Sequence, residues 1–183
     1  MIVLSDLQID NIARVFTVLD HDGNGRIEWA DFELVTTGMA RECGRDPESP
    51  QVKALLGCYR EMWDYLREFA DADRDDSVTS AEFRSAYERS EVFATELRNH
   101  WARVADAVFT MADVDVDGQL TTDDLLDLYL GAEIPQQIAV PGIRSMTREE
   151  GGHIDRAAFR DTVCGVFTAT RESEPGGSVL KGL

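Results

Sequence analysis

The sequence predicts an all-α protein in which pairs of helices are joined by short acidic loops. Three acidic segments of similar pattern recur in the same register, beginning at Asp20, Asp71 and Asp113. Apolar residues at helical spacing come before each segment, and an apolar residue follows the last acid of every copy. Because an internal repeat of this kind marks one supersecondary unit, the chain is expected to be an array of helix–loop–helix units.

Each acidic segment places oxygen-bearing side chains at alternate positions. Counted from its first aspartate, every copy has acids at positions 1, 3 and 12 and an acid or asparagine at position 5. Carboxylates this close repel one another, so a hard cation bound between them is the first candidate to offset the repulsion. The candidate ligands are Asp20, Asp22, Asn24 and Asp31 in the first segment, Asp71, Asp73, Asp75 and Glu82 in the second, and Asp113, Asp115, Asp117 and Asp124 in the third.

The pattern resembles the EF-hand calcium loop, D-x-[DN]-x-[DN]-G-x5-E. In that loop side chains at positions 1, 3, 5 and 12 and the backbone carbonyl at position 7 surround one ion. The resemblance implies that Arg26, Ser77 and Gln119 supply the carbonyl oxygens. It also implies a short β contact between paired loops at position 8, so Ile27 is expected to face Val78.

Helices are expected on both sides of every loop. Ser5 and Gln8 form a capping-box pattern, and Ser49 with Pro50 is a good N-cap and first turn. The entering helices are expected to bury Ile9, Ile12, Ala13, Phe16 and Leu19; then Val52, Leu55, Leu56, Tyr59, Met62, Trp63, Leu66 and Phe69; then Phe93, Leu97, Trp101, Val104, Ala105, Val108 and Phe109. Leu125, Leu128 and Tyr129 continue a leaving helix up to Gly131.

A fourth hand is expected because EF-hands normally come in pairs. Ile154 and Phe159 reproduce the spacing of positions 8 and 13, which places the loop over residues 147–158, with Gly152 at the turn position. This loop has lost most of its ligands and is expected to hold no ion, while Ile154 should still pair with Leu120. Its entering helix is expected to be poor, because the prolines at 135 and 141 interrupt it.

The expected architecture is four EF-hands in two paired lobes that form one compact unit, with short β contacts between paired loops. Residues 1–89 would hold hands one and two, residues 90–171 hands three and four, and residues 172–183 an irregular tail. The long first lobe, with a turn-rich linker over 41–50, and the silent hand are similar to the sarcoplasmic calcium-binding proteins and bacterial calerythrin. Two alternatives stay open for the tail: it is mobile, or Val179, Leu180 and Leu183 plug a groove in the C-terminal lobe.

Composition narrows the range of partners. The chain has 35 acidic and 18 basic residues and a formal charge of −17, which argues against nucleic acid as a partner. No apolar run approaches the length of a membrane span, and the N-terminus lacks the pattern of a signal peptide. Cys43, Cys58 and Cys164 share no metal-ligand spacing and are expected to be reduced, as in the cytoplasm. A monomer is expected.

The resemblance implies a calcium buffer or transporter with three sites. The alternative is a calcium sensor that opens to bind a helix of a target protein, but sensors favour methionine-rich grooves and this chain has only five methionines. No G-x-S-x-G, P-loop or HExxH motif suggests an enzyme. Loop two has Asp76 where the pattern has glycine, which is expected to weaken that site. Asp31 and Asp124 are one methylene shorter than Glu82, so sites one and three are expected to accept Mg²⁺ as well as Ca²⁺.

Overall fold

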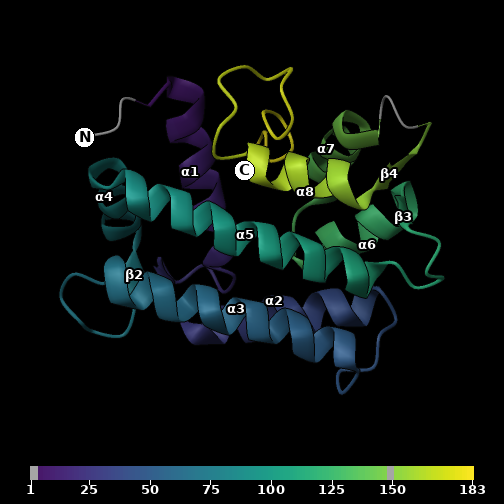
Figure 1. The fold of residues 1–183 in the computed structure, drawn as a ribbon, viewed down its shortest axis with the longest axis horizontal. Coiled ribbons are helices and arrows are strands. Elements are labelled where there is room, and N and C mark those ends of the chain that lie inside the picture. The colour runs from purple at the N-terminus through teal and green to yellow at the C-terminus, as the bar shows by residue number, and fades with distance from the viewer. Residues whose placement is uncertain (1–3, 148–150) are drawn as a thin grey trace.

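The structure, a computed structural model, describes residues 4–147 and 151–183. Within these ranges the chain forms eight helices and four short strands (Figure 1). The helices are α1 (Asp6–Leu19), α2 (Trp29–Glu42), α3 (Pro50–Phe69), α4 (Ser80–Arg89), α5 (Glu91–Ala112), α6 (Thr122–Gly131), α7 (Gln136–Thr147) and α8 (Arg156–Gly165). The strands are β1 (Arg26–Ile27), β2 (Val78–Thr79), β3 (Gln119–Thr121) and β4 (His153–Asp155). None of the described helices is both long and apolar enough to cross a membrane.

The helices begin where the sequence places their caps. The Ser5 hydroxyl accepts the Gln8 amide at 3.3 Å, and the Gln8 side chain accepts the Ser5 amide at 2.9 Å, so the predicted capping box is confirmed. The Ser49 hydroxyl caps α3 by accepting the Val52 amide at 3.4 Å, with Pro50 in the first turn. These bonds satisfy amide groups that have no partner inside the helix, which fixes the start of two of the entering helices.

The paired loops are joined by the predicted β contacts. Strand β1 pairs with β2 in antiparallel register, with Ile27 opposite Val78. Strand β3 pairs with β4 in the same manner, with Leu120 opposite Ile154. All four side chains are fully buried, so each pair of loops is held together by a small apolar contact directly beneath the acidic residues.

The two predicted helix pairs share one hydrophobic core. The long helices α3 and α5 lie side by side (Figure 1), and α2 packs on α6. At that second crossing a Cβ atom on Gly38 would lie 2.1 Å from the Gly131 carbonyl oxygen, so the backbones touch without side chains between them. The Arg45 guanidinium, in the linker after α2, donates to the carbonyls of Met111 and Asp113 at 2.6 and 2.8 Å. The compact unit expected from the sequence is confirmed; the boundary at residues 89 and 90 stays a prediction.

The chain after α8 packs against both halves of the molecule. The Asn11 side chain in α1 donates to the Val166 carbonyl at 3.1 Å, and the Phe167 ring is buried against Tyr87 and Trp101. Further along, Val179 is 3% exposed and its carbonyl accepts the Tyr129 hydroxyl at 3.1 Å. Of the two alternatives for the tail, the structure therefore supports the plug.

Three expectations about the helices are wrong. Phe69 is 55% exposed, and its ring centroid lies 4.8 Å from that of Tyr65, because it is on the outer side of α3, whereas Leu66 and Ala70 are buried. Ala13 is also exposed, since the buried side of α1 is centred on its neighbours. Helix α7 forms despite Pro141, because the proline lies on the exposed side while Ala139 and Ile143 face the core.

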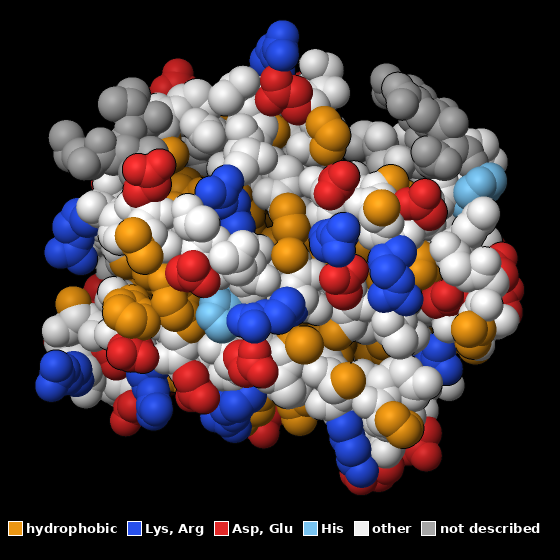
Figure 2. All heavy atoms as spheres, viewed as in Figure 1, with side chains coloured by type: hydrophobic (Ala, Val, Ile, Leu, Met, Phe, Trp, Pro, Cys, Tyr) orange, Lys and Arg blue, Asp and Glu red, His pale blue; other side chains and the backbone are white. Residues whose placement is uncertain are grey.

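The surface mixes acidic and basic side chains over the face shown in Figure 2, with hydrophobic side chains gathered near one end of α3 and α5. Phe69 and Val92, 55% and 72% exposed, come from those ends. The three cysteines are half-buried and free. Burial raises the pKa of the Cys43 thiol to about 12, so this thiol is protonated at neutral pH.

Candidate metal centres

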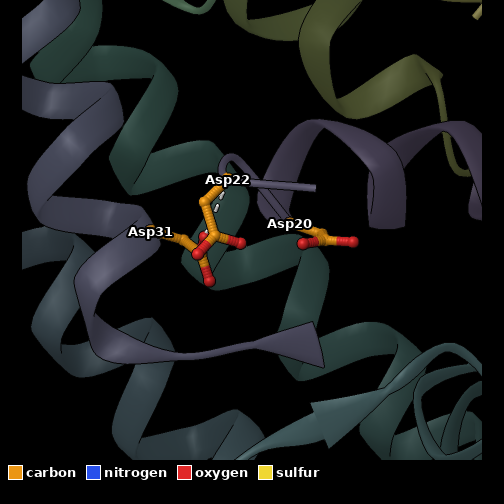
Figure 3. A group of neighbouring side chains, drawn as sticks. All are labelled: Asp20, Asp22 and Asp31. Atoms are coloured by element: carbon orange, nitrogen blue, oxygen red, sulfur yellow. Dashed lines mark hydrogen bonds between the residues drawn. The ribbon is translucent and has the colours of Figure 1, made fainter. Parts of the chain in front are cut away.

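Loop one joins α1 to α2 and gathers three carboxylates. Asp20, Asp22 and Asp31 each offer an oxygen within 4.8 Å of the others (Figure 3). Asp31 is 2% exposed. Its two oxygens accept the amides of Glu28 and Asp22 at 2.7 and 3.2 Å, which fixes its orientation. Burial, more than repulsion from Asp22 and Asp20, raises the pKa of this carboxyl group. A cation bound among the three groups would favour the charged form.

One oxygen of loop one shows that the donor set fits a cation. Asp20 Oδ2 accepts the Gly25 amide at 2.9 Å, whereas Asp20 Oδ1 is buried and has no hydrogen-bond partner among the described residues. A buried carboxylate oxygen without a donor costs free energy. Hard cations are bound by carboxylate and carbonyl oxygens, and these are the groups that line this loop.

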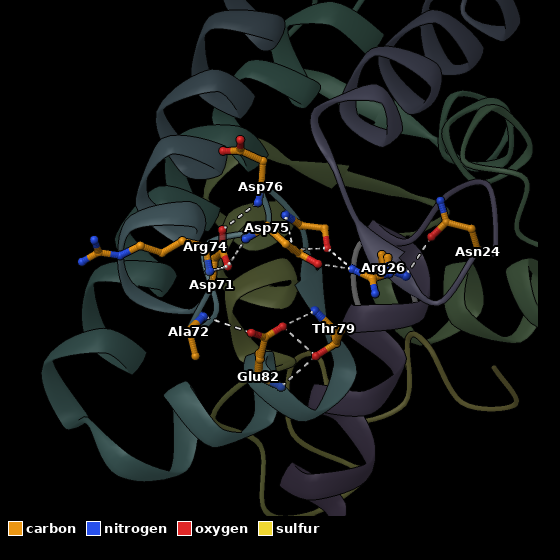
Figure 4. A network of polar contacts seen from close by, with 10 residues as sticks. Asn24, Arg26, Asp71, Ala72, Arg74, Asp75, Asp76, Thr79 and Glu82 are labelled. Atoms are coloured by element: carbon orange, nitrogen blue, oxygen red, sulfur yellow. Dashed lines mark hydrogen bonds and ion pairs between the residues drawn. The ribbon is translucent and has the colours of Figure 1, made fainter.

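Loop two, between α3 and α4, gathers Asp71, Asp73 and Glu82 within the same 4.8 Å. Glu82 Oε1 accepts the Ala72 amide at 3.0 Å, and Oε2 accepts the Thr79 amide and hydroxyl at 2.9 and 2.7 Å (Figure 4). Burial opposes ionisation of Glu82, but these donors outweigh it and lower its pKa. The last acid of this loop therefore also caps the helix that leaves the loop.

Asp76 occupies the turn position of loop two in a left-handed conformation, with φ of +63°. Its amide donates to Asp71 Oδ2 at 3.1 Å, as the Gly25 and Gly118 amides do to the first aspartates of their own loops. The loop thus keeps the EF-hand turn without glycine, and an aspartate carries the strain of a positive φ.

Loop three, between α5 and α6, differs from loops one and two in the position of its twelfth residue. Asp113, Asp115 and Asp117 form its cluster. Asp124, the predicted twelfth ligand, lies outside that cluster, and its Oδ2 atom accepts the Thr121 amide at 2.8 Å and the Thr121 hydroxyl at 2.7 Å. In loops one and two, the carboxylate of the twelfth residue accepts a hydrogen bond from a backbone amide near the start of the loop. Asp124 shows no such contact in the described structure.

The remaining predicted ligands at positions 5 and 7 are arranged around turns of the loops. Asn24 Oδ1 accepts the Arg26 amide at 2.9 Å, and Asp117 Oδ1 accepts the Gln119 amide at 2.8 Å. The predicted roles of Asn24 and of the carbonyls of Arg26, Ser77 and Gln119 in binding an ion stay predictions. In loop four, Gly152 has φ of +100° and donates to the Thr147 carbonyl at 3.3 Å. Residues 148–150 of that loop lie outside the described part, and its lack of an ion stays a prediction.

Asp75 is the exception among the predicted acids of loop two, because it does not join that cluster. Its Oδ2 atom accepts a 2.5 Å hydrogen bond from Arg26 of loop one, and the same guanidinium nitrogen contacts the Ser77 hydroxyl at 2.6 Å (Figure 4). Hydrogen bonds from Ser77 and Arg26 lower the pKa of Asp75. The EF-hand pattern predicts only a backbone role for Arg26 and gives no role to its side chain. The pairing of the loops was the available signal, because it places Arg26 opposite Thr79.

Similar proteins are calcium-binding proteins. Calerythrin from Saccharopolyspora erythraea is 29% identical over 117 residues, which cover 63% of this chain and 66% of calerythrin, just under two thirds of its length. The structure of a Streptomyces coelicolor calcium-binding protein, studied for prokaryotic calcium-mediated regulation, has a TM-score of 0.77 at 26% identity and covers 88% of this chain and 98% of that one. A sarcoplasmic calcium-binding protein from amphioxus shares the fold, with a TM-score of 0.71 at 18% identity, and covers 99% of this chain and 100% of that one. No protein-family model matches the chain.

Paired helix–loop–helix units with acidic loops joined by short β contacts are the features of an EF-hand protein, and this chain resembles the EF-hand superfamily of calcium-binding proteins in sequence and in structure. Within that superfamily it resembles the bacterial and sarcoplasmic calcium-binding proteins. These similar proteins are calcium-binding proteins and indicate no enzymatic family.

Proposed function

We propose that the protein is a calcium buffer or transporter that holds three ions, one in each of loops one, two and three. The three clusters of carboxylates carry this proposal, because each brings three acids together in a turn of EF-hand shape. Three divalent ions would bring the formal charge from −17 to about −11 and relieve much of the repulsion within the loops.

The packing of the leaving helices supports a buffer more than a sensor. A sensor of this class opens its helix pairs to expose a groove rich in methionine. Here α2 and α6, the leaving helices of hands one and three, touch backbone to backbone at Gly38 and Gly131. Met39, Met62 and Met111 are 5%, 0% and 0% exposed. Separating α2 from α6 would therefore break contacts within the shared core, instead of uncovering an apolar groove that is already formed.

The net charge and the cysteines support two further parts of the proposal, which concern the partners of the protein and its location in the cell. The net charge of −17 disfavours nucleic acid as a partner, and the free, half-buried thiols are compatible with a reducing cytoplasm. We propose a monomer whose partners are Ca²⁺ and, at sites one and three, Mg²⁺.

The rival is a calcium sensor, and two observations favour it. The Streptomyces coelicolor protein of similar structure is described as acting in calcium-mediated regulation. In addition, an apolar pocket of about 140 Å³ lies among α1, α5, α6, α7, α8 and the tail, lined by residues that include Trp101, Leu128, Phe159 and Val179. Calcium-driven release of the tail would enlarge this pocket into a groove for a partner helix.

Two titrations test the proposal. Isothermal calorimetry of calcium into protein stripped with a chelator should give three ions per chain, and simultaneous replacement of Asp20, Asp71 and Asp113 by alanine should abolish binding. A stoichiometry of four, or binding that survives the triple replacement, would contradict the assignment. If the protein is a calcium buffer, the fluorescence of a dye that binds apolar surface should fall as calcium is added, because the metal orders the fold. Brightening would support the sensor.

A further inference from the structure

The side chain of Arg26 crosses from loop one into loop two. Its Nη1 atom donates to Asp75 Oδ2 at 2.5 Å and to the Ser77 hydroxyl at 2.6 Å (Figure 4). The pairing of β1 with β2 explains this reach, because Arg26 stands opposite Thr79 and its side chain extends along the start of the partner strand. The contact joins residues 49 positions apart in the chain.

Asp75 lies outside the cluster formed by the other acids of its loop, and both of its oxygens accept hydrogen bonds. Its Oδ1 atom accepts the Ser77 amide at 3.0 Å and the Ser77 hydroxyl at 2.7 Å, while Oδ2 is engaged by Arg26. Asp117 has the same position in loop three and lies within its own cluster, whereas Asp75 does not. Both oxygens of Asp75 are thus committed to protein donors.

The described residues of the second pair of loops, which leave out 148–150, place no arginine where the first pair has Arg26. Its register places Gln119 opposite Asp155 and Thr121 opposite His153. Gln119 has the position in loop three that Arg26 has in loop one, and its side chain is neutral. Among the described residues, a guanidinium contacts the side-chain oxygen of a predicted calcium ligand in the first pair, at Asp75, and the corresponding contact is not formed by Gln119 in the second.

We infer that Arg26 is a built-in competitor of calcium at site two. An ion that takes Asp75 as a ligand has to displace the guanidinium from Oδ2, because a cation and an arginine cannot both approach one oxygen closely without repelling each other. Arg26 thereby lowers the calcium affinity of site two, and it links this site to loop one, whose own predicted ligand is the Arg26 carbonyl. The inference rests on the proposed function, since it assumes that loop two binds calcium.

The expected effect is modest because the pair is open to solvent. The side chains of Arg26 and Asp75 are 46% and 38% exposed. Exposed ion pairs of this kind change equilibria by roughly two- to five-fold. Removing the guanidinium should therefore tighten site two by about that factor and leave site three unchanged.

The test compares Arg26→Gln with Arg74→Gln in the full-length protein. Arg74 lies within loop two, and its side chain forms no ion pair in the described structure, so its replacement removes the same charge without freeing Asp75. The backbone amides of Gly25, Asp76 and Gly118 each donate to the first aspartate of a loop. Their NMR signals during a calcium titration therefore report each site separately. Arg26→Gln should shift the Asp76 midpoint to lower calcium than Arg74→Gln does, and equal shifts in the two variants would overturn the inference.

A second readout does not depend on affinity. In protein stripped of calcium, the Arg26 side-chain signals should show the slow rotation of a paired guanidinium. They should lose it at the calcium concentration at which the Asp76 amide shifts. If the guanidinium stays paired while site two fills, Arg26 does not compete and the inference is wrong. If none of the three amides responds to calcium, the proposed function fails first, so the two failures are distinguishable.

Discussion

Replacing Gly38 by alanine tests the close contact between α2 and α6. The new Cβ atom would lie 2.1 Å from the Gly131 carbonyl oxygen and 3.2 Å from its carbonyl carbon. Both neighbours are backbone atoms, so no side chain can rotate away. The two helices would have to separate by roughly 1 Å, which weakens every dispersion contact across the crossing. Val35 and Met39 on α2 and Leu128 on α6 are buried side chains within three residues of this contact.

The expected change in the free energy of unfolding is the sum of two opposing effects. Overpacking a core typically costs about 1–3 kcal/mol. Alanine in place of glycine inside a helix returns about 1 kcal/mol. Because the clash is with rigid backbone, the upper part of the first range applies, and the net loss should be about 2 kcal/mol. For a chain of this size that loss lowers the melting temperature by about 4–8 °C.

Gly57→Ala is the matched control. Gly57 also lies inside a helix, α3, but nothing stands within 4 Å of the position that its Cβ atom would occupy. This variant should gain up to about 1 kcal/mol. Urea unfolding of both variants in chelator, followed by circular dichroism, measures the difference. Equal stability of the two alanine variants would show that α2 and α6 do not touch as described, and the argument for a closed buffer would lose its main support.

Three further variants test the individual sites and the tail. Asp76→Gly should tighten site two several-fold, because it relieves a positive φ of 63° that costs an aspartate about 1 kcal/mol. The NMR signal of the backbone amide at position 76 during a calcium titration measures the affinity of this site, and no gain in affinity would refute the strain argument. Asp31→Glu with Asp124→Glu should make calcium binding less sensitive to millimolar magnesium, since a longer acid can offer both oxygens to calcium; unchanged competition in calorimetry would show that the twelfth residue does not set selectivity. Val179→Ala should cost about 1–2 kcal/mol through a cavity beneath the tail, whereas Lys181→Ala, at an exposed ion pair, should change the melting temperature little; equal effects would mean that the tail is not docked.

The positions of the loops and their pairing could be predicted from residue type and spacing alone. The twelve-residue pattern predicted the positions of all three clusters, and the aliphatic residue at position 8 predicted the registers of Ile27 with Val78 and of Leu120 with Ile154. It also predicted the capping box of Ser5 and Gln8. These features could be predicted because they are local: a helix cap and the grouping of acids within about twelve residues follow from residue type and spacing.

Tertiary structure decided the features that depend on which segments meet. Three such contacts join residues that are far apart in the chain. They are the close approach of Gly38 to Gly131, the hydrogen bond from the Tyr129 hydroxyl to the Val179 carbonyl, and the hydrogen bond from Arg26 to Asp75. No pattern within a single helix or loop marks these contacts, since a glycine in a helix or an arginine in a loop has the same local preference whatever lies opposite. For Arg26 the predicted pairing of the loops was a partial signal, because it places Arg26 beside loop two without naming Asp75 as its partner. Packing selects their partners, because a dense core allows only one arrangement of its helices, and that arrangement brings the guanidinium of loop one onto a carboxylate of loop two.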